Sequence, residues 1–260
     1  MKHRLYRKKL NIKTVGILTA ILLLWQLVVM LFDIPETILP SPVSALAHLF
    51  LTQPDANYRW GRHIFATLTA VGTGFVITAL FSIIIAVVIA WFSTLNRILM
   101  PAFIFINSLP IIAIAPILLI WFGYGLFTNV LIAFLIAFFP VVINTLKGLN
   151  DVDPDLLDLV QYMNAKKMIV FLKIRIPNSL PFMFAGLKVS ATLVVVGAIV
   201  GEFIASDRGL GYIIINSQYS MDTAPVFSSL IVISFIGIGL FSLVALVEKV
   251  LMPWRRETTD

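Results

Sequence analysis

Residues 147–181 read KGLNDVDPDLLDLVQYMNAKKMIVFLKIRIPNSLP, a polar and amphipathic stretch between two long apolar blocks. A charged side chain in the hydrocarbon core of a bilayer is costly in free energy, so this cluster of charges is not expected to lie inside a membrane. We therefore expect this stretch, the central loop, to lie in water and to dock onto another molecule.

The rest of the chain is strongly apolar. Hydrophobic residues make up 60% of the sequence and charged residues only 12%, whereas a soluble domain carries roughly 25% charged residues. Three runs without Asp, Glu, Lys or Arg cover residues 64–96, 98–146 and 223–247. Each run exceeds the ~20 residues that cross a bilayer as a helix. Because a chain in lipid must satisfy its own backbone hydrogen bonds, these runs are predicted to be helical.

We predict an all-α membrane protein with six spanning helices between residues 14 and 247. The predicted spans are 14–32, 64–92, 98–121, 128–146, 182–204 and 225–247. The third and fourth contain Pro110, Pro116 and Pro140, each of which is expected to break or bend its helix. Asn107 is polar at mid-depth, so Asn107 and Pro110 are candidates for a translocation path.

The positions of Lys and Arg predict the orientation in the membrane. Fifteen of these residues lie on one side: six in the tail 1–13, Arg97, five in the central loop and three in the tail 248–260. Arg59, Arg62 and Arg208 lie on the other side. Both termini and the central loop are therefore predicted to be cytoplasmic. Anionic lipid explains the net charge of +6, so no nucleic-acid partner is expected.

An ion-coupled secondary carrier is the main alternative class. Such carriers keep ionisable groups inside their helices to bind the coupling ion, and here only Lys188 and Glu202 fall inside a span. Lys188 lies close enough to the cytoplasmic end to reach the interface. Glu202 lies near the outer end, where it could reach water or serve as a gate.

The sequence also lacks the signatures of a membrane-embedded enzyme. Its three histidines, His3, His48 and His63, lie outside the spans, no HExxH pattern occurs, and there is no cysteine. No cofactor and no metal site are predicted. The dipeptide Gly-Lys is absent as well, so ATP would have to bind to another polypeptide. A scaffold or receptor could carry a docking loop, but would not explain a third span broken by proline.

The central loop has the start and stop signals of a short helix. Asp153 can cap it, Pro154 suits its first position and Asp155 favours its positive end. Apolar residues follow at 156, 157, 159, 160 and 163, which indicates one apolar face. Asn164 suits a left-handed turn. A second amphipathic segment is expected from Lys166, and Pro177 and Pro181 mark the approach to the fifth span.

This pattern resembles the coupling loop of ABC importer permeases, which reads Glu-Ala-Ala, three residues, Gly, nine residues and then Ile-x-Leu-Pro. The spacing fits without a gap, although several identities differ. The matching coupling residues are Asp158, Leu159, Val160, Asn164, Ala165, Ile174, Ile176 and Pro177. The resemblance implies that this loop transmits movement to an ATPase and that Leu159 and Val160, which are bulkier than two alanines, fit a dedicated one.

Further motifs resemble the nitrate, sulfonate, taurine and pyrimidine-precursor permeases of that family. They are ILPSP at 38–42, LPIIAIAP at 109–116, WFGYG at 121–125, GEF at 201–203 and GLGY at 209–212. The resemblance implies a type I ABC importer transmembrane domain in the bacterial inner membrane. It also implies two ATPase subunits, a second permease copy or related permease, and an extracytoplasmic solute-binding protein as partners. The expected substrate is a small organic solute or anion.

Overall fold

The computed structural model describes residues 2–51 and 59–253, and all regular structure among them is helical. Residues 254–260 of the predicted tail 248–260 lie outside the described residues. The helices are α1 Lys2–Leu31, α2 Pro42–Leu51, α3 Trp60–Trp91, α4 Ser93–Ser108, α5 Ile111–Phe122, α6 Leu126–Asn150, α7 Pro154–Tyr162, α8 Lys167–Val170, a π-helical stretch Phe171–Arg175, α9 Ile176–Ala205, α10 Leu210–Tyr219 and α11 Thr223–Leu251. The all-α prediction is confirmed.

Four helical runs among the described residues are long and apolar enough to cross a membrane: α3, α6, Lys167–Ala205 and α11. The pair α4 and α5 gives a fifth if it counts as one span. The apolar helix Thr19–Leu31 within α1 is shorter. The predicted count of six spans is therefore not confirmed.

Of the three prolines expected to break or bend a span, one stands at a break. The predicted third span, 98–121, is broken as expected: it consists of α4 and α5 with a bend of 91° between them. Pro110 stands at the N-cap of α5, where its missing N–H and its ring prevent α4 from continuing. Pro116 and Pro140, in contrast, lie inside unbroken helices. A break at these two prolines is therefore wrong, whereas a bend there stays a prediction. Pro177 and Pro181 likewise lie within α9.

The chain divides into two compact units, Met1–Arg62 with Ile213–Val232 and His63–Tyr212 with Ile233–Asp260. In the first unit, Ser41 Oγ accepts a hydrogen bond from Ser44 N (3.0 Å) and so caps α2. Ser228 Oγ donates to the Ala45 carbonyl (2.7 Å). Burial lowers the pKa of His48 on α2, and the nearby charge of Asp222 offsets part of that shift.

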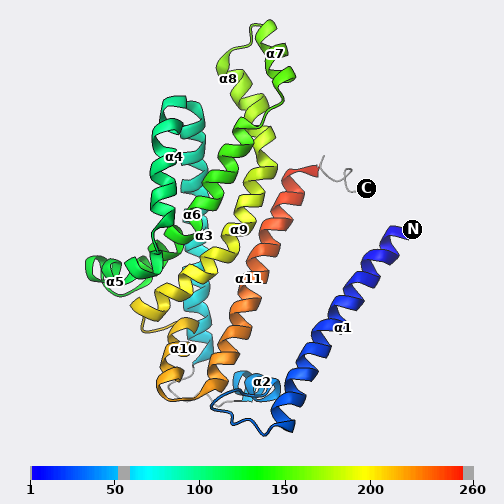
Figure 1. Ribbon diagram of the computed structural model, residues 1–260, viewed down its shortest axis with the longest axis vertical. Helices are drawn as coiled ribbons and strands as arrows, with labels where there is room; N and C mark the ends of the chain where they lie inside the picture. The colour runs from blue at the N-terminus through cyan, green and yellow to red at the C-terminus, as the bar shows by residue number, and fades with distance from the viewer. Residues whose placement is uncertain (1, 52–58, 254–260) are drawn as a thin grey trace. The chain divides into compact units, whose positions relative to one another are not determined.

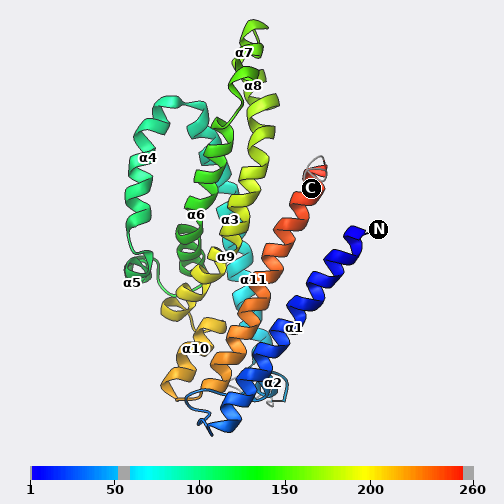
Figure 2. The ribbon, with the colours of Figure 1, turned by 45° about the vertical axis from the view of Figure 1, so that its right-hand side comes forward.

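The second unit is built on α3, α6 and α9, with α6 and α9 side by side (Figures 1 and 2). One apolar cluster joins the three helices through Ala70, Val71, Ala133, Ala137, Val194, Val195 and Ala198. Small residues let the backbones of α6 and α9 approach closely: an ideal Cβ at Gly197 would lie 2.6 Å from Ala133 Cα, and one at Gly201 would lie 2.8 Å from Asn129 Cα. Such close approach is how helices associate in lipid.

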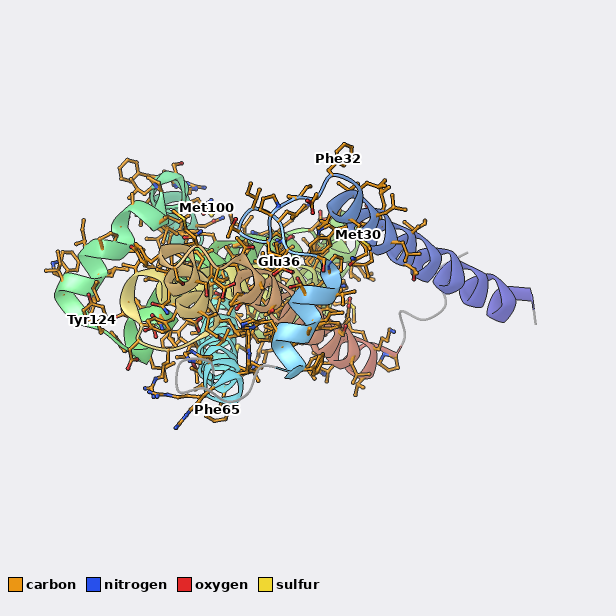
Figure 3. The ribbon with its side chains drawn as sticks, turned by 90° about the horizontal axis from the view of Figure 1, so that it is seen from below. Met30, Phe32, Glu36, Phe65, Met100 and Tyr124 are labelled. Atoms are coloured by element: carbon orange, nitrogen blue, oxygen red, sulfur yellow. The ribbon has the colours of Figure 1, made fainter. Side chains whose placement is uncertain are left out.

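Large apolar side chains also cover the outside of this unit, as expected for a protein in lipid. Phe65 on α3 and Tyr124 after α5 are 71% and 77% exposed, and both lie at the outer edge of the helices in Figure 3. Lys188, which the sequence places within a span, forms an ion pair: its Nζ lies 2.7 Å from Glu248 Oε2 on α11. This partner was not identified from the sequence.

Candidate functional site

The first part of the predicted coupling loop folds as its caps indicate. Asp153 Oδ1 accepts a hydrogen bond from Asp155 N (3.0 Å), with Pro154 at the first helical position of α7. The helix ends at Tyr162, and Asn164 has a φ of +50°. The left-handed turn predicted at Asn164 is confirmed.

The turn after α7 is a Schellman motif. Ala165 N donates to the Val160 carbonyl (3.0 Å), and Asn164 N donates to the Gln161 carbonyl (2.9 Å). These two bonds satisfy carbonyls at the end of the helix that would otherwise lack a partner. The turn therefore fixes the orientation of α7 relative to the chain that follows it. The geometry of the turn depends on the left-handed backbone of Asn164.

α7 and α8 project beyond the end of α6 (Figures 1 and 2). No residue of α7 is buried. Leu157 and Val160 are half-buried, and the apolar surface that is uncovered includes Leu159 (55% exposed), Tyr162 (87%) and Met163 (72%). An uncovered apolar surface of this kind marks an interaction site.

Seven of the eight predicted coupling residues line two hollows or lie around the start of α9, and Leu159 lines neither of these hollows. Asp158 and Asn164 share one hollow of about 520 Å³ with Gln161 and Tyr162. Val160 and Ala165 line another, between α7 and the end of α3. Ile174 lies in the π-helical stretch, and Ile176 and Pro177 open α9.

Two side chains that the sequence did not identify hold this loop to the helices. Asn178 Nδ2 donates to the Gly148 carbonyl (3.0 Å) and to the Asp151 carbonyl (2.9 Å), joining the start of α9 to the end of α6. Lys167 Nζ donates to the Trp91 carbonyl (3.2 Å) and lies 4.7 Å from the Trp91 ring centroid. No sequence signal marked either contact, since each joins segments that are distant in the chain.

The three candidates for the translocation path are not brought onto one surface. Asn107 and Pro110 are exposed around the break between α4 and α5. Glu202 is only 1% exposed, so the expectation that its carboxyl group reaches water is wrong. Among the described residues, no group of three or more His, Asp or Glu side chains could hold a metal ion.

Glu202 belongs to a buried hydrogen-bonded cluster at the start of α10, here called the α10 anchor. Three side chains satisfy three successive backbone N–H groups: Gly209 N donates to His63 Nδ1 (3.0 Å), Leu210 N to Thr67 Oγ1 (2.9 Å) and Gly211 N to Glu202 Oε2 (2.7 Å). Thr67 Oγ1 in turn donates to Glu202 Oε1 (2.7 Å). The cluster thus caps α10 with side chains from α3 and α9.

Gly209 is required by the α10 anchor for two reasons. Its φ of +117° is one that side chains rarely tolerate. A Cβ at this position would also collide with the carboxyl group of Glu202. The GEF and GLGY motifs at 201–203 and 209–212 are therefore parts of one structural unit.

Comparison with known proteins adds independent evidence. Residues 78–252 match the family model described as binding-protein-dependent transport system inner membrane component. The chain is 32% identical to the riboflavin transport system permease protein RibX of Chloroflexus aurantiacus, over 91% of this chain and 88% of that protein.

Two further relatives also match over most of the chain. The formylaminopyrimidine transport permease protein ThiX of Halalkalibacterium halodurans is 28% identical over 91% of this chain and 93% of its own length. The putative aliphatic sulfonates transport permease protein SsuC of Bacillus subtilis is 28% identical over 96% and 92%. The matches therefore span nearly the whole chain and include the central loop.

Proposed function

Because the chain belongs to the family of binding-protein-dependent transport system inner membrane components, we propose that it forms the substrate path of an ABC importer and is driven through the loop 151–177. The chain is an ABC transporter permease, a membrane transport subunit and not an enzyme. Family membership implies ATPase partners and a binding protein. It also removes the reason to favour an ion-coupled carrier.

The observation that carries the proposal is the uncovered apolar face of α7. Leu159, Tyr162 and Met163 are exposed at the tip of a loop whose start, turn and base are each fixed by hydrogen bonds. An amphipathic helix of this kind fits a groove on a partner. In the proposed mechanism, ATP binding closes an ATPase dimer, the loop from Asp158 to Ala165 follows, and the spanning helices change from inward-open to outward-open.

Topology and assembly follow as further parts of the proposal. The distribution of Lys and Arg supports cytoplasmic tails at 1–13 and 248–260 and a cytoplasmic loop at 147–181. Two permeases, which are copies of this chain or this chain with a relative, would enclose one path above two ATPase subunits in the inner membrane. Asn107 and Pro110 are the proposed path residues of this chain.

For the substrate, we propose a small organic solute or anion, of the sulfonate, nitrate or pyrimidine-like vitamin-precursor type. The support is the similarity to a formylaminopyrimidine transport permease, a riboflavin transport system permease and a putative aliphatic sulfonates transport permease. Uptake of labelled sulfonate, nitrate and pyrimidine precursors by cells with and without this chain would distinguish these classes.

Replacing Tyr162 with serine should weaken ATPase attachment. Truncation of a well-buried interface tyrosine costs about 2 kcal/mol or more, roughly thirtyfold in affinity. The measurement is co-purification in detergent with the cognate ATPase, compared between the wild type and Tyr162→Ser. Tyr219→Ser is the matched control, since Tyr219 is equally exposed, at 86%, but lies on α10. A folded wild-type chain that retains no ATPase would refute the proposed function.

Replacing Asn164 with valine should also uncouple the loop, through its backbone. A β-branched residue at a φ of +50° is strained by about 1–2 kcal/mol, so the Schellman turn should open and ATPase retention should fall about five- to thirtyfold. Asn164→Gly is the control, because glycine accepts this conformation. Equal ATPase retention and transport in the two variants would contradict a role of the turn in coupling.

A further inference from the structure

The hollow between α7 and the end of α3 carries an unassigned constellation of charges, and we refer to it as the basic pocket. It measures about 450 Å³ and is formed by Trp91, α7, α8 and the π-helical stretch. Lys167 and Arg175 line it, and none of the described residues in its lining is acidic. The pocket therefore has an excess of two positive charges.

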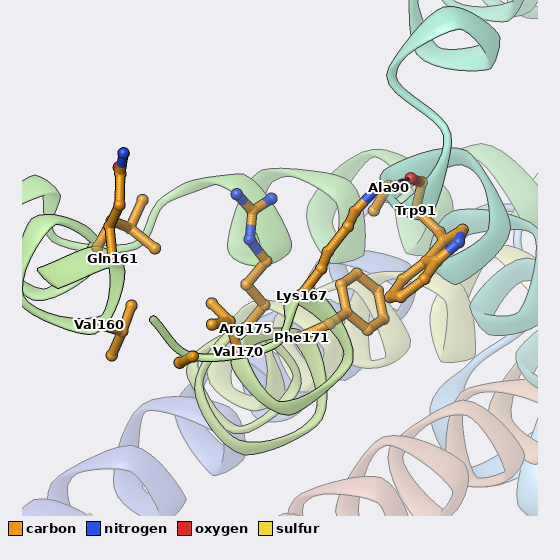
Figure 4. Close-up of a pocket in the computed structure, with 10 residues that line it drawn as sticks. Ala90, Trp91, Val160, Gln161, Lys167, Val170, Phe171 and Arg175 are labelled. Carbon is orange, nitrogen blue, oxygen red and sulfur yellow. Dashed lines mark hydrogen bonds between the residues drawn. The ribbon is translucent and has the colours of Figure 1, made fainter. Parts of the chain in front are cut away.

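The guanidinium of Arg175 has N–H donors available for a ligand. Among the described residues, its guanidinium makes no hydrogen bond and no ion pair, although it offers five N–H donors in a planar fork. Lys167 uses one donor on the Trp91 carbonyl and keeps two others. In Figure 4 the polar ends of Gln161, Arg175 and Lys167 extend to the same side of the pocket. Such a set of donors fits an oxyanion.

The remaining lining of the pocket is apolar apart from Gln161, and two of its residues, Ala90 and Trp91, lie at the end of α3, a candidate membrane span. Trp91 is the last residue of α3, within the uncharged run 64–96, and its ring meets Phe171 edge-on with centroids 5.0 Å apart. Tryptophan is typical of the boundary between lipid and water. Val160 and Val170 add aliphatic surface. A ligand here would have an anionic group next to an apolar part.

We propose that the basic pocket binds the phosphate of an anionic phospholipid headgroup in the cytoplasmic leaflet. Basic pockets at the cytoplasmic ends of spanning helices attract such headgroups. In this proposal, the guanidinium of Arg175 donates two hydrogen bonds to the phosphate. Lys167, which is held in place by the Trp91 carbonyl, supplies a second positive charge. Gln161 on α7 donates a hydrogen bond from its neutral amide. Because α7 forms one wall, the bound lipid would tie the position of this helix to the membrane surface. This inference rests on the proposed cytoplasmic position of the loop 147–181, and the pocket shares Val160 and Ala165 with the proposed coupling residues. The binding itself requires only the permease, so it is measured without the ATPase.

The test measures protection of the purified full-length permease against thermal unfolding in neutral detergent. Phosphatidylglycerol should protect the wild type more than phosphatidylcholine, and inorganic phosphate should protect little. Arg175→Gln should weaken the response to phosphatidylglycerol about five- to tenfold. Lys173→Gln is the matched control: it removes the same charge from an exposed residue two positions away that does not line the pocket.

A second variant keeps the test valid if Arg175→Gln does not fold. Gln161→Glu places a negative charge in the pocket from an exposed position on α7, with the same change in net charge as the other variants. It should also weaken the response to phosphatidylglycerol. Equal responses in Gln161→Glu and Lys173→Gln would overturn the proposal, and so would equal protection by inorganic phosphate. Loss of ATPase retention in Arg175→Gln, with the lipid response intact, would assign the pocket to an acidic group of the ATPase instead.

Discussion

Replacing Gly197 with leucine is expected to separate α9 from α6 and to prevent the permease from reaching its folded state. The Cβ of any side chain at Gly197 would lie 2.6 Å from Ala133 Cα and 3.2 Å from Ala133 N. These are backbone atoms of a neighbouring helix, so no rotation of a flexible side chain relieves the overlap. Ordinary overpacking costs about 1–3 kcal/mol, and a clash between two backbones should exceed this range.

The measurement is the yield of monodisperse protein on size-exclusion chromatography in detergent. Gly239→Leu is the control: it makes the same change on α11 at a position where a Cβ would meet nothing within 4 Å. We expect Gly239→Leu to match the wild type and Gly197→Leu to aggregate, with Gly197→Ala in between. A monodisperse Gly197→Leu variant would show that α6 and α9 do not pack as closely as the structure has them.

The sequence predicts the features of this protein that depend on local chemistry. Charge-free runs predict apolar helices because lipid excludes charge, and α3, α6 and α11 follow the three such runs. Asp153, Pro154 and Asn164 predict the ends of α7 because caps and turns depend on residues within a few positions. The pattern of the coupling loop was visible for the same reason.

What the sequence does not predict are contacts between distant segments. Nothing in the pattern of small residues indicates that Gly197 faces Ala133, because several registers of two apolar helices are possible. Lys167 and Trp91, which define the basic pocket, are 76 positions apart. Glu202 looked like an interfacial residue because its acceptor role toward Gly211 and Thr67 depends on how three helix ends meet.

Replacing Glu202 with alanine is expected to release the start of α10 and to be as damaging as any single polar substitution in this chain. The carboxyl group accepts from Thr67 Oγ1 and from Gly211 N, at 2.7 Å each, and is only 1% exposed. Without it, two buried donors lose their acceptor, at a cost on the order of 3 kcal/mol. Thr67 would then hold Leu210 N less firmly, since Glu202 orients the Thr67 hydroxyl.

Thermal unfolding in detergent measures this effect. Glu202→Gln should be much milder, because the amide keeps one oxygen acceptor and the shape of the side chain. Asp207→Ala is the matched control, since it removes a carboxylate five positions away that is 80% exposed. Among the residues that the structure describes, Asp207 pairs with Arg208 alone, a contact of little worth at the surface. The expected order of stability is wild type and Asp207→Ala, then Glu202→Gln, then Glu202→Ala. If Glu202→Ala unfolds at the same temperature as Asp207→Ala but no longer transports substrate, then Glu202 acts on the translocation path and does not anchor α10.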